Sequence, residues 1–109
     1  MEDLENEVWV DTINNPNYLV SNKGRIRHKF KNNLLSPVGT CGYYKVRLSY
    51  QGKITDWLVH KLVFASFNNE DFNDKNYCID HIDGNKHNNY LENLRKITIS
   101  ENVRNAYYT

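Results

Sequence analysis

Apolar and polar residues alternate along most of the first half of the chain, which is the pattern of half-buried β-strands. Clusters of Asn, Gly and Ser interrupt this alternation, and such residues favour turns. Strands are expected over residues 7–13, 25–30, 44–50 and 53–57, and residues 18–20 form a short apolar run that ends in a turn. The cluster 14–17 is expected to be a turn, and the stretch 31–42, with its proline and two glycines, a loop.

The spacing of apolar residues changes to that of a helix at residue 58. Leu58, Leu62 and Val63 lie on one face of a helix near 58–67. We expect this helix to be short and to be buried beneath the sheet. His60 lies within it, and its expected role is structural.

The last part of the chain has the order strand, long loop, strand, helix, and a polar, acidic linker at 68–76 leads into it. The expected elements are strands at 77–82 and 94–99, a loop at 83–93 and a helix at 101–108. Ser100 is a favourable N-cap for that helix. The fold is therefore expected to be α+β, with a small antiparallel β-sheet and a short helix in residues 1–75 and a second unit in residues 76–109.

Length and composition exclude several classes of protein. With 109 residues, 39% of them apolar and 25% charged, the chain is ordinary for one compact globular unit or two small ones. We expect no membrane span, since no apolar run is long enough, and no signal peptide, since the N-terminus is acidic. Cys41 and Cys78 are too few for a disulfide scaffold, so both are expected to be free thiols in a reducing compartment.

Charge is segregated along the chain, although the formal net charge is only +1. Residues 1–22 contain five acidic residues and no basic one, whereas residues 23–61 contain nine basic residues and one acidic residue, Asp56. A basic sheet face with few acids can lie on a phosphate backbone, and the alternative is a solvated outer face. The candidate phosphate contacts are Lys23, Arg25, Arg27, Lys29, Lys45 and Arg47, together with Arg95, Lys96 and Arg104, which are as easily surface charges.

The densest polar cluster is Asp80-His81, at the end of an expected strand with asparagines downstream. A calcium-binding loop with Gly84 in its glycine position would lack ligands at its first and last positions. A zinc site starting from Cys78 and His81 lacks a second ligand pair, so no zinc is expected. A single-metal phosphodiesterase site remains, in which a carboxylate and an amide hold a hard cation and a neutral histidine deprotonates water.

Residues 78–106 resemble the HNH endonuclease motif, also called the His-Me or ββα-metal finger. The matching features are Asp-His, Asp-Gly-Asn, Asn-Asn, Glu-Asn-Leu and Ser-Glu-Asn, in that order. The likeness is to the branch found in phage and intron-encoded homing endonucleases. The first half of the chain resembles a modular DNA-binding motif that accompanies these nucleases, through Val20-Ser21-Asn22, Gly42-Tyr43-Tyr44 and Val59-His60-Lys61.

The resemblance implies roles for specific residues. Asp80 would be a metal ligand, and His81 would be the general base that activates water. Asn93 would pin the long loop and orient His81, and Asn102 would be the second metal ligand, where many relatives have histidine. The metal would be Mg²⁺, with Mn²⁺ as the alternative. The other loop asparagines, Asn85, Asn88 and Asn89, are expected to form turns.

The sequence therefore predicts a metal-dependent endonuclease that cuts double-stranded DNA, one strand per active site, as the resemblance implies. A non-catalytic DNA-binding module derived from such a nuclease is the alternative. Monomer and homodimer are both open at this point, and the target sequence is not predicted. The expected site of action is the cytoplasm of a bacterial host cell, with a phage or mobile element as the expected origin.

Overall fold

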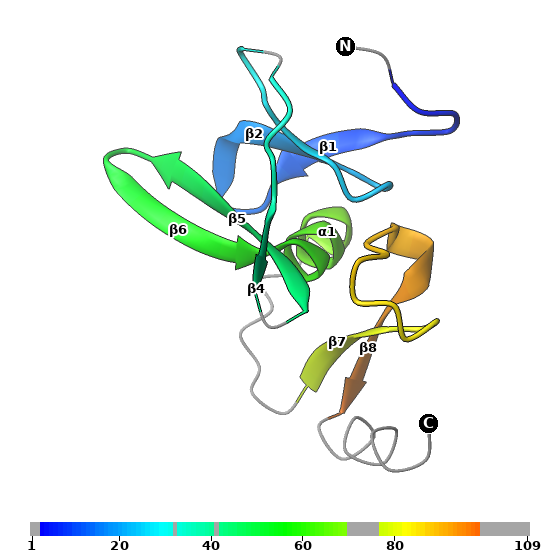
Figure 1. The fold of residues 1–109 in the computed structure, drawn as a ribbon. Coiled ribbons are helices and arrows are strands. Elements are labelled where there is room, and N and C mark those ends of the chain that lie inside the picture. Colours follow the sequence, from blue (N-terminus) through cyan, green and yellow to red (C-terminus); the bar gives the residue numbers. More distant parts are fainter. Residues whose placement is uncertain (1–2, 32, 41, 70–76, 99–109) are drawn as a thin grey trace.

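The computed structural model describes residues 3–31, 33–40, 42–69 and 77–98. In these residues, three small antiparallel sheets pack around one helix (Figure 1). The first sheet contains β1 (Trp9–Thr12), β2 (Asn15–Ser21) and β3 (Ile26–His28), and the second contains β4 (Val38–Thr40), β5 (Tyr43–Tyr50) and β6 (Lys53–Leu58). The helix α1 is Val59–Asn68; the third sheet contains β7 (Tyr77–His81) and β8 (Leu94–Thr98), and a short 3₁₀ helix, η1 (Leu91–Asn93), precedes β8.

The first sheet is an up-and-down meander with an apolar inner side. Val20 and Ile26 are paired across β2 and β3, and both are almost fully buried. The chain turns between these strands at residues 21–24, where Gly24 has a φ of +81°, a conformation that L side chains rarely adopt. The Ser21 hydroxyl accepts two backbone N–H groups of this connection at 3.1 Å, which fixes the turn.

The second sheet packs its apolar side on α1. In β5, Val46 and Leu48 are buried while Arg47 between them is exposed, as strand alternation predicts. The helix is capped at its C-terminus by Asn69, which has a left-handed φ of 49° and donates its N–H to carbonyl groups of the last turn. The buried residues of the helix are Val59, His60, Leu62, Val63 and Ala65.

One hydrophobic core connects all three sheets. Ile79 of β7 and Leu94 of β8 belong to the same buried cluster as Val20, Leu48 and Leu62. The β7–β8 hairpin is therefore packed on α1 together with the N-terminal sheets. This shared core fixes the end of β7 relative to α1 and to the turns of the first sheet.

Most predicted elements are present, and the α+β class is confirmed. The helix near 58–67 and the strands at 44–50, 53–57, 77–82 and 94–99 are confirmed with small shifts at their ends. The predicted N-cap Ser100 and the predicted helix at 101–108, with Asn102 and Arg104, lie outside the described residues. Cys41 also lies outside the described residues, so the expectation of two free thiols stays a prediction.

Two predictions about loops are wrong. Residues 38–40 of the predicted loop form β4, because the edge of β5 offers their backbone groups an antiparallel partner. The strand β2 begins at Asn15, inside the predicted turn 14–17, so the connection from β1 is shorter than expected. In the described part of the chain, no helix has the length and apolar character needed to cross a membrane.

Candidate active site

Asp80 and His81 end strand β7, and strand alternation directs their side chains to opposite faces. Asp80 is opposite Arg95 in the β7–β8 ladder, and its Oδ2 accepts a hydrogen bond from Arg95 Nε at 2.9 Å. His81 points inward and is only 6% exposed. The carboxylate is therefore accessible on the hairpin while the imidazole is held in the interior.

A second buried side chain holds the His81 ring. Its Nε2 lies 2.8 Å from Oδ1 of Asn89, which is also only 6% exposed. Because an amide oxygen can only accept a hydrogen bond, the neutral His81 ring carries its proton on Nε2 and keeps a lone pair on Nδ1. An imidazole in this tautomer can accept a proton from a water molecule through Nδ1.

Asn93 connects the two ends of the long loop. Its side-chain oxygen accepts the N–H of Asp83 at 3.1 Å, and its side-chain nitrogen donates to Asp83 Oδ1 at 3.0 Å and to the Asn88 carbonyl at 2.9 Å. Its own carbonyl accepts the N–H of Ile82 at 2.8 Å. Hydrogen bonds to the Asp83 carboxylate, first from the Asn88 side chain, keep the pKa of Asp83 below its usual value. The Asp83 carboxylate is thus engaged in the loop itself.

The contacts of the loop asparagines differ from those expected from the sequence. From the sequence, Asn93 is expected to orient His81, but the side chain that accepts the hydrogen bond from the ring is Asn89. Asn85 and Asn88 form the predicted turns, since each side-chain oxygen accepts a backbone N–H two residues further on. These turns direct the next side chain, Asn89, toward the interior.

Two further rings pack beside the buried imidazole. His60 of α1 lies 4.8 Å from His81 between ring centroids, and Tyr43 stacks on His60 at 5.1 Å. Burial lowers the pKa of His60 to about 3, and the nearby His81 and Lys61 add to this effect. His60 is therefore neutral at pH 7 and places no charge against His81. The histidine expected to be structural also forms a wall of the site.

A cleft of about 690 Å³ opens at the end of β7, a volume typical of ligand-binding clefts. Its lining includes Tyr43, His60, Asp80, His81, Lys86 and Arg95. The Lys86 ammonium lies 4.8 Å from the centroid of the Tyr43 ring, within cation–π range. The cleft thus brings together carboxylates, the His81 imidazole and basic side chains, which suits a phosphate ester.

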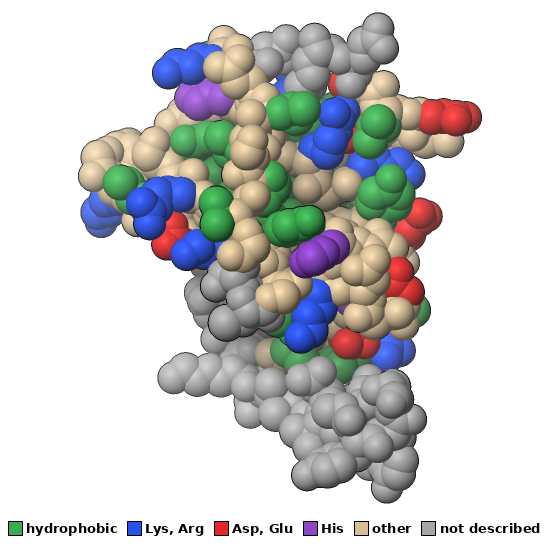
Figure 2. Space-filling model, viewed as in Figure 1, with side chains coloured by type: hydrophobic (Ala, Val, Ile, Leu, Met, Phe, Trp, Pro, Cys, Tyr) green, Lys and Arg blue, Asp and Glu red, His purple; other side chains and the backbone are tan. Residues whose placement is uncertain are grey.

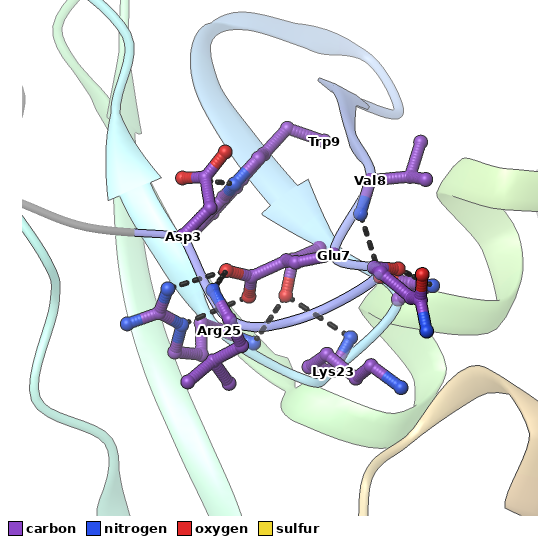
Figure 3. A network of polar contacts seen from close by, with 10 residues as sticks. Asp3, Glu7, Val8, Trp9, Lys23 and Arg25 are labelled. Carbon is purple, nitrogen blue, oxygen red and sulfur yellow. Dashed lines mark hydrogen bonds and ion pairs between the residues drawn. The ribbon is translucent and has the colours of Figure 1, made fainter.

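Around the first sheet, two of the bases predicted to contact DNA, Arg25 and Lys29, are engaged with acidic side chains. Arg25 pairs with Glu7 at two points, and its Nε donates to Glu7 Oε2 at 2.8 Å (Figure 3). Lys29 Nζ lies 2.9 Å from Asp11 Oδ1. The expectation that acids are nearly absent from this face is wrong, because antiparallel folding brings the acidic start of the chain beside the basic strand.

The second sheet and the hairpin show the same arrangement. Arg47 and Lys45 both pair with Asp56, at 3.0 and 3.7 Å, and Arg47 and Asp56 are cross-strand partners. On the side of the molecule that Figure 2 shows, acidic side chains accordingly lie among the basic ones. Other candidate bases lie over aromatic rings: Arg27 over Trp9, Lys23 over Tyr90 and Lys96 over Tyr77, all within 4.8 Å of the centroid.

Comparison with known proteins identifies the class to which this arrangement belongs. The HNH endonuclease family model matches residues 58–104, which include α1 and the β7–β8 hairpin with Asp80 and His81. The chain therefore carries an HNH endonuclease domain, and the resemblance found in the sequence is confirmed.

The relatives include a characterised enzyme. The chain is 37% identical, over 81% of its length, to the DNA endonuclease I-HmuI of Bacillus phage SP01. A solved structure, of DNA binding and cleavage by the HNH homing endonuclease I-HmuI, matches 93% of the chain with a TM-score of 0.81 and 32% identity. Two uncharacterized HNH endonucleases of Acanthamoeba polyphaga mimivirus are each 35% identical, over 83% and 82% of the chain.

These matches show that the chain is homologous to HNH homing endonucleases. The chain spans half or less of the length of the curated relatives, namely 27% and 23% of the two mimivirus proteins and 50% of I-HmuI, and 58% of the solved chain. HNH endonucleases generally use divalent metal ions.

The donor groups present fit a hard cation. Asp80 offers carboxylate oxygens at the cleft, and Mg²⁺ is commonly held by one or two carboxylates while keeping several waters. Among the described residues there is no cluster of three or more His, Cys, Asp or Glu that could enclose a metal. A metal site built on Asp80 would therefore be open and would leave several waters on the metal. The predicted second ligand, Asn102, lies outside the described residues.

Three residues that contact His81 or line the cleft, namely Asn89, Tyr43 and Lys86, are absent from the site predicted from the sequence. Asn89 could not be told apart from the neighbouring turn-forming asparagines by its sequence. Tyr43 lies in the segment that resembles the accompanying DNA-binding motif, and that resemblance was the available signal. Lys86 is an isolated lysine in a polar loop, and no pattern in the sequence distinguishes it.

Proposed function

We propose that the chain is a metal-dependent DNA endonuclease that hydrolyses a phosphodiester bond of double-stranded DNA. The observation that carries the proposal is the buried pair of His81 and Asn89, beside Asp80 at one cleft. This arrangement provides a proton acceptor, Nδ1 of His81, next to an oxygen donor suited to a metal. Homology to proteins named as DNA endonucleases supports the substrate class.

Each residue of the proposed site has a distinct task. His81 takes a proton from the attacking water, and Asn93 keeps the loop closed around the histidine. Asp80 and Asn102 hold Mg²⁺, for which Mn²⁺ can substitute. When bound, the metal stabilises the negative charge that builds up on the phosphate and on the leaving oxygen.

We propose that residues 1–75 hold the DNA and residues 76–109 cut it. The proposed phosphate contacts are Lys23, Arg25, Arg27, Lys29, Lys45, Arg47, Arg95, Lys96 and Arg104. Those engaged with carboxylates contribute less net affinity, because each must exchange one anionic partner for another. Lys86 is an addition to this set, since it lines the cleft beside His81.

A single active site acts on one strand at a time, so a monomer nicks and two copies or two events are needed for a double-strand break. The expected place of action is the cytoplasm of a bacterial host cell, where duplex DNA is accessible. Incubation of supercoiled plasmid with Mg²⁺, Mn²⁺ or EDTA tests the proposal. Open circles that form with metal and not with EDTA support it. Absence of cutting with either metal, alongside a retained gel shift of duplex DNA, would instead indicate a binding module.

A further inference from the structure

The turn at residues 21–24 of the first sheet lies against the loop that holds the catalytic histidine. The carbonyl of Asn22 accepts the N–H of Leu91 at 2.8 Å. Next to this hydrogen bond, the Lys23 ammonium lies 4.8 Å from the centroid of the Tyr90 ring. Segments from opposite ends of the described chain therefore meet at this turn.

Gly24 of the turn leaves no room for a side chain against the same loop. A Cβ at this position would lie 2.9 Å from Cβ of Asn89 and 3.0 Å from its carbonyl oxygen. Backbone atoms cannot move aside as easily as the end of a flexible side chain. Gly24 is thus required both by its φ of +81° and by its contact with Asn89.

Asn89 consequently lies between the turn and the histidine. On one side, the Cβ and backbone of Asn89 lie against Gly24. On the other side, the carboxamide oxygen of Asn89 accepts the hydrogen bond from Nε2 of His81. We propose that the turn 21–24 is a positioning element for His81. The turn holds Asn89 in the place where the Asn89 side chain fixes the orientation and the tautomer of the His81 ring. This inference rests on the proposed function of His81 as the proton acceptor.

The first sheet makes this turn rigid. The Asn22 side chain accepts the N–H of Val8 at 2.8 Å and donates to the carbonyl of Asn6 at 3.2 Å. The adjacent ion pair of Arg25 with Glu7 ties the same turn to the start of the chain (Figure 3). The proposed DNA-holding segment is therefore also part of the support of the active site.

Two alanine variants with matched backbone strain test the inference. Gly24→Ala and Gly52→Ala both place a side chain at a left-handed φ, +81° and +80°, but a Cβ at Gly52 meets nothing within 4 Å. We expect Gly24→Ala to lower the single-turnover rate of DNA cleavage at saturating protein by about tenfold to a hundredfold, as loss of a supporting contact does. The half-saturating protein concentration stays unchanged, and Gly52→Ala cuts at the wild-type rate.

The ring of His81 gives a readout that does not depend on cutting. Long-range ¹⁵N–¹H spectra, recorded with the ring neutral, should show the proton on Nε2 in the wild type and in Gly52→Ala. In Gly24→Ala and in Asn89→Ala we expect a mixture of tautomers. Asn89→Asp keeps an oxygen acceptor and is expected to restore the Nε2–H form.

Several results would overturn the inference. Equal cleavage rates and equal ring spectra for the two glycine variants would show that the turn does not act on His81. A loss of DNA affinity with an unchanged rate in Gly24→Ala would make the turn a DNA contact instead. If the wild type cuts no DNA, the proposed function fails, while the ring spectra still decide whether the turn positions the histidine.

Discussion

The Glu7 carboxylate and the Arg25 guanidinium form a two-point ion pair that joins the acidic start of the chain to the strand β3 region. The Glu7 side chain is inaccessible to solvent, and the Arg25 side chain is mostly covered. An arginine that the charge pattern assigns to DNA thus has a structural partner. The acidic and basic segments neutralise each other in the fold, although they are separate in the sequence.

The ion pair predicts a dependence of stability on pH. The hydrogen bond from Arg25 is the largest of the effects that lower the pKa of Glu7 from 4.5 to about 2. Because the folded pKa is depressed, the stabilisation is fully present above pH 4.5 and is lost as the pH falls toward 2. We expect Glu7→Gln to lower the free energy of unfolding at pH 7 by on the order of 1–2 kcal/mol, with the difference from wild type vanishing near pH 2.

Urea unfolding of both proteins across this pH range measures the effect. Glu5→Gln, at an exposed position two residues away, is the control and should stay within about 0.5 kcal/mol of wild type at every pH. A Glu7→Gln variant as stable as wild type at pH 7 would show that the pair contributes nothing.

The same contacts predict which bases control the salt dependence of DNA binding. Each phosphate neutralised contributes about −0.9 to the slope of log K against log salt. Lys86→Ala should make this slope shallower by about 0.9, because Lys86 lines the cleft beside the proposed scissile phosphate. Arg25→Ala should instead lower the unfolding free energy, because it leaves the Glu7 carboxylate without its ion-pair partner. Fluorescence anisotropy of duplex DNA at several salt concentrations measures the slope for Lys86→Ala, and chemical denaturation measures the unfolding free energy of Arg25→Ala. A wild-type slope for Lys86→Ala would remove Lys86 from the interface.

Asn93 is expected to matter for folding as well as for cutting. Asn93→Ala removes the partners of the Asp83 N–H and of the Asn88 carbonyl, at an expected loss of about 1–3 kcal/mol in unfolding free energy. Asn85→Ala, which removes a turn contact on the exposed side of the same loop, should lose less than about 1 kcal/mol. Chemical denaturation compares them, and equal losses would contradict the pinning role of Asn93.

Local patterns were sufficient to predict much of this fold. Apolar residues alternate in 44–50 and follow helical spacing at Leu58, Leu62 and Val63. Both patterns arise because one face of the element is buried, and the structure shows this burial. The Asp-His pair and the spaced asparagines identified the hairpin and its family. These features are local or follow a fixed spacing, so they are visible in one sequence.

Contacts between distant segments could not be predicted in this way. The strand β4 forms only because β5 provides an edge, and its own three residues carry no strong strand signal. Asn89 and Asn93 are chemically identical, and only the turns around them decide which one reaches His81. The contact of Gly24 with Asn89 depends on the shared core, which packs the hairpin against the first sheet.

We propose that His81 is the proton acceptor in DNA hydrolysis. The most direct test is the single-turnover rate at which wild type, His81→Ala and His87→Ala nick supercoiled plasmid in Mg²⁺, with affinity for duplex DNA measured in parallel. His87 is an exposed histidine of the same loop and serves as the matched control. We expect a rate lower by about 10²-fold or more for His81→Ala, since general base catalysis contributes that much. We expect this variant to keep wild-type affinity, and His87→Ala to nick at the wild-type rate. Nicking by His81→Ala at the wild-type rate would contradict the proposal.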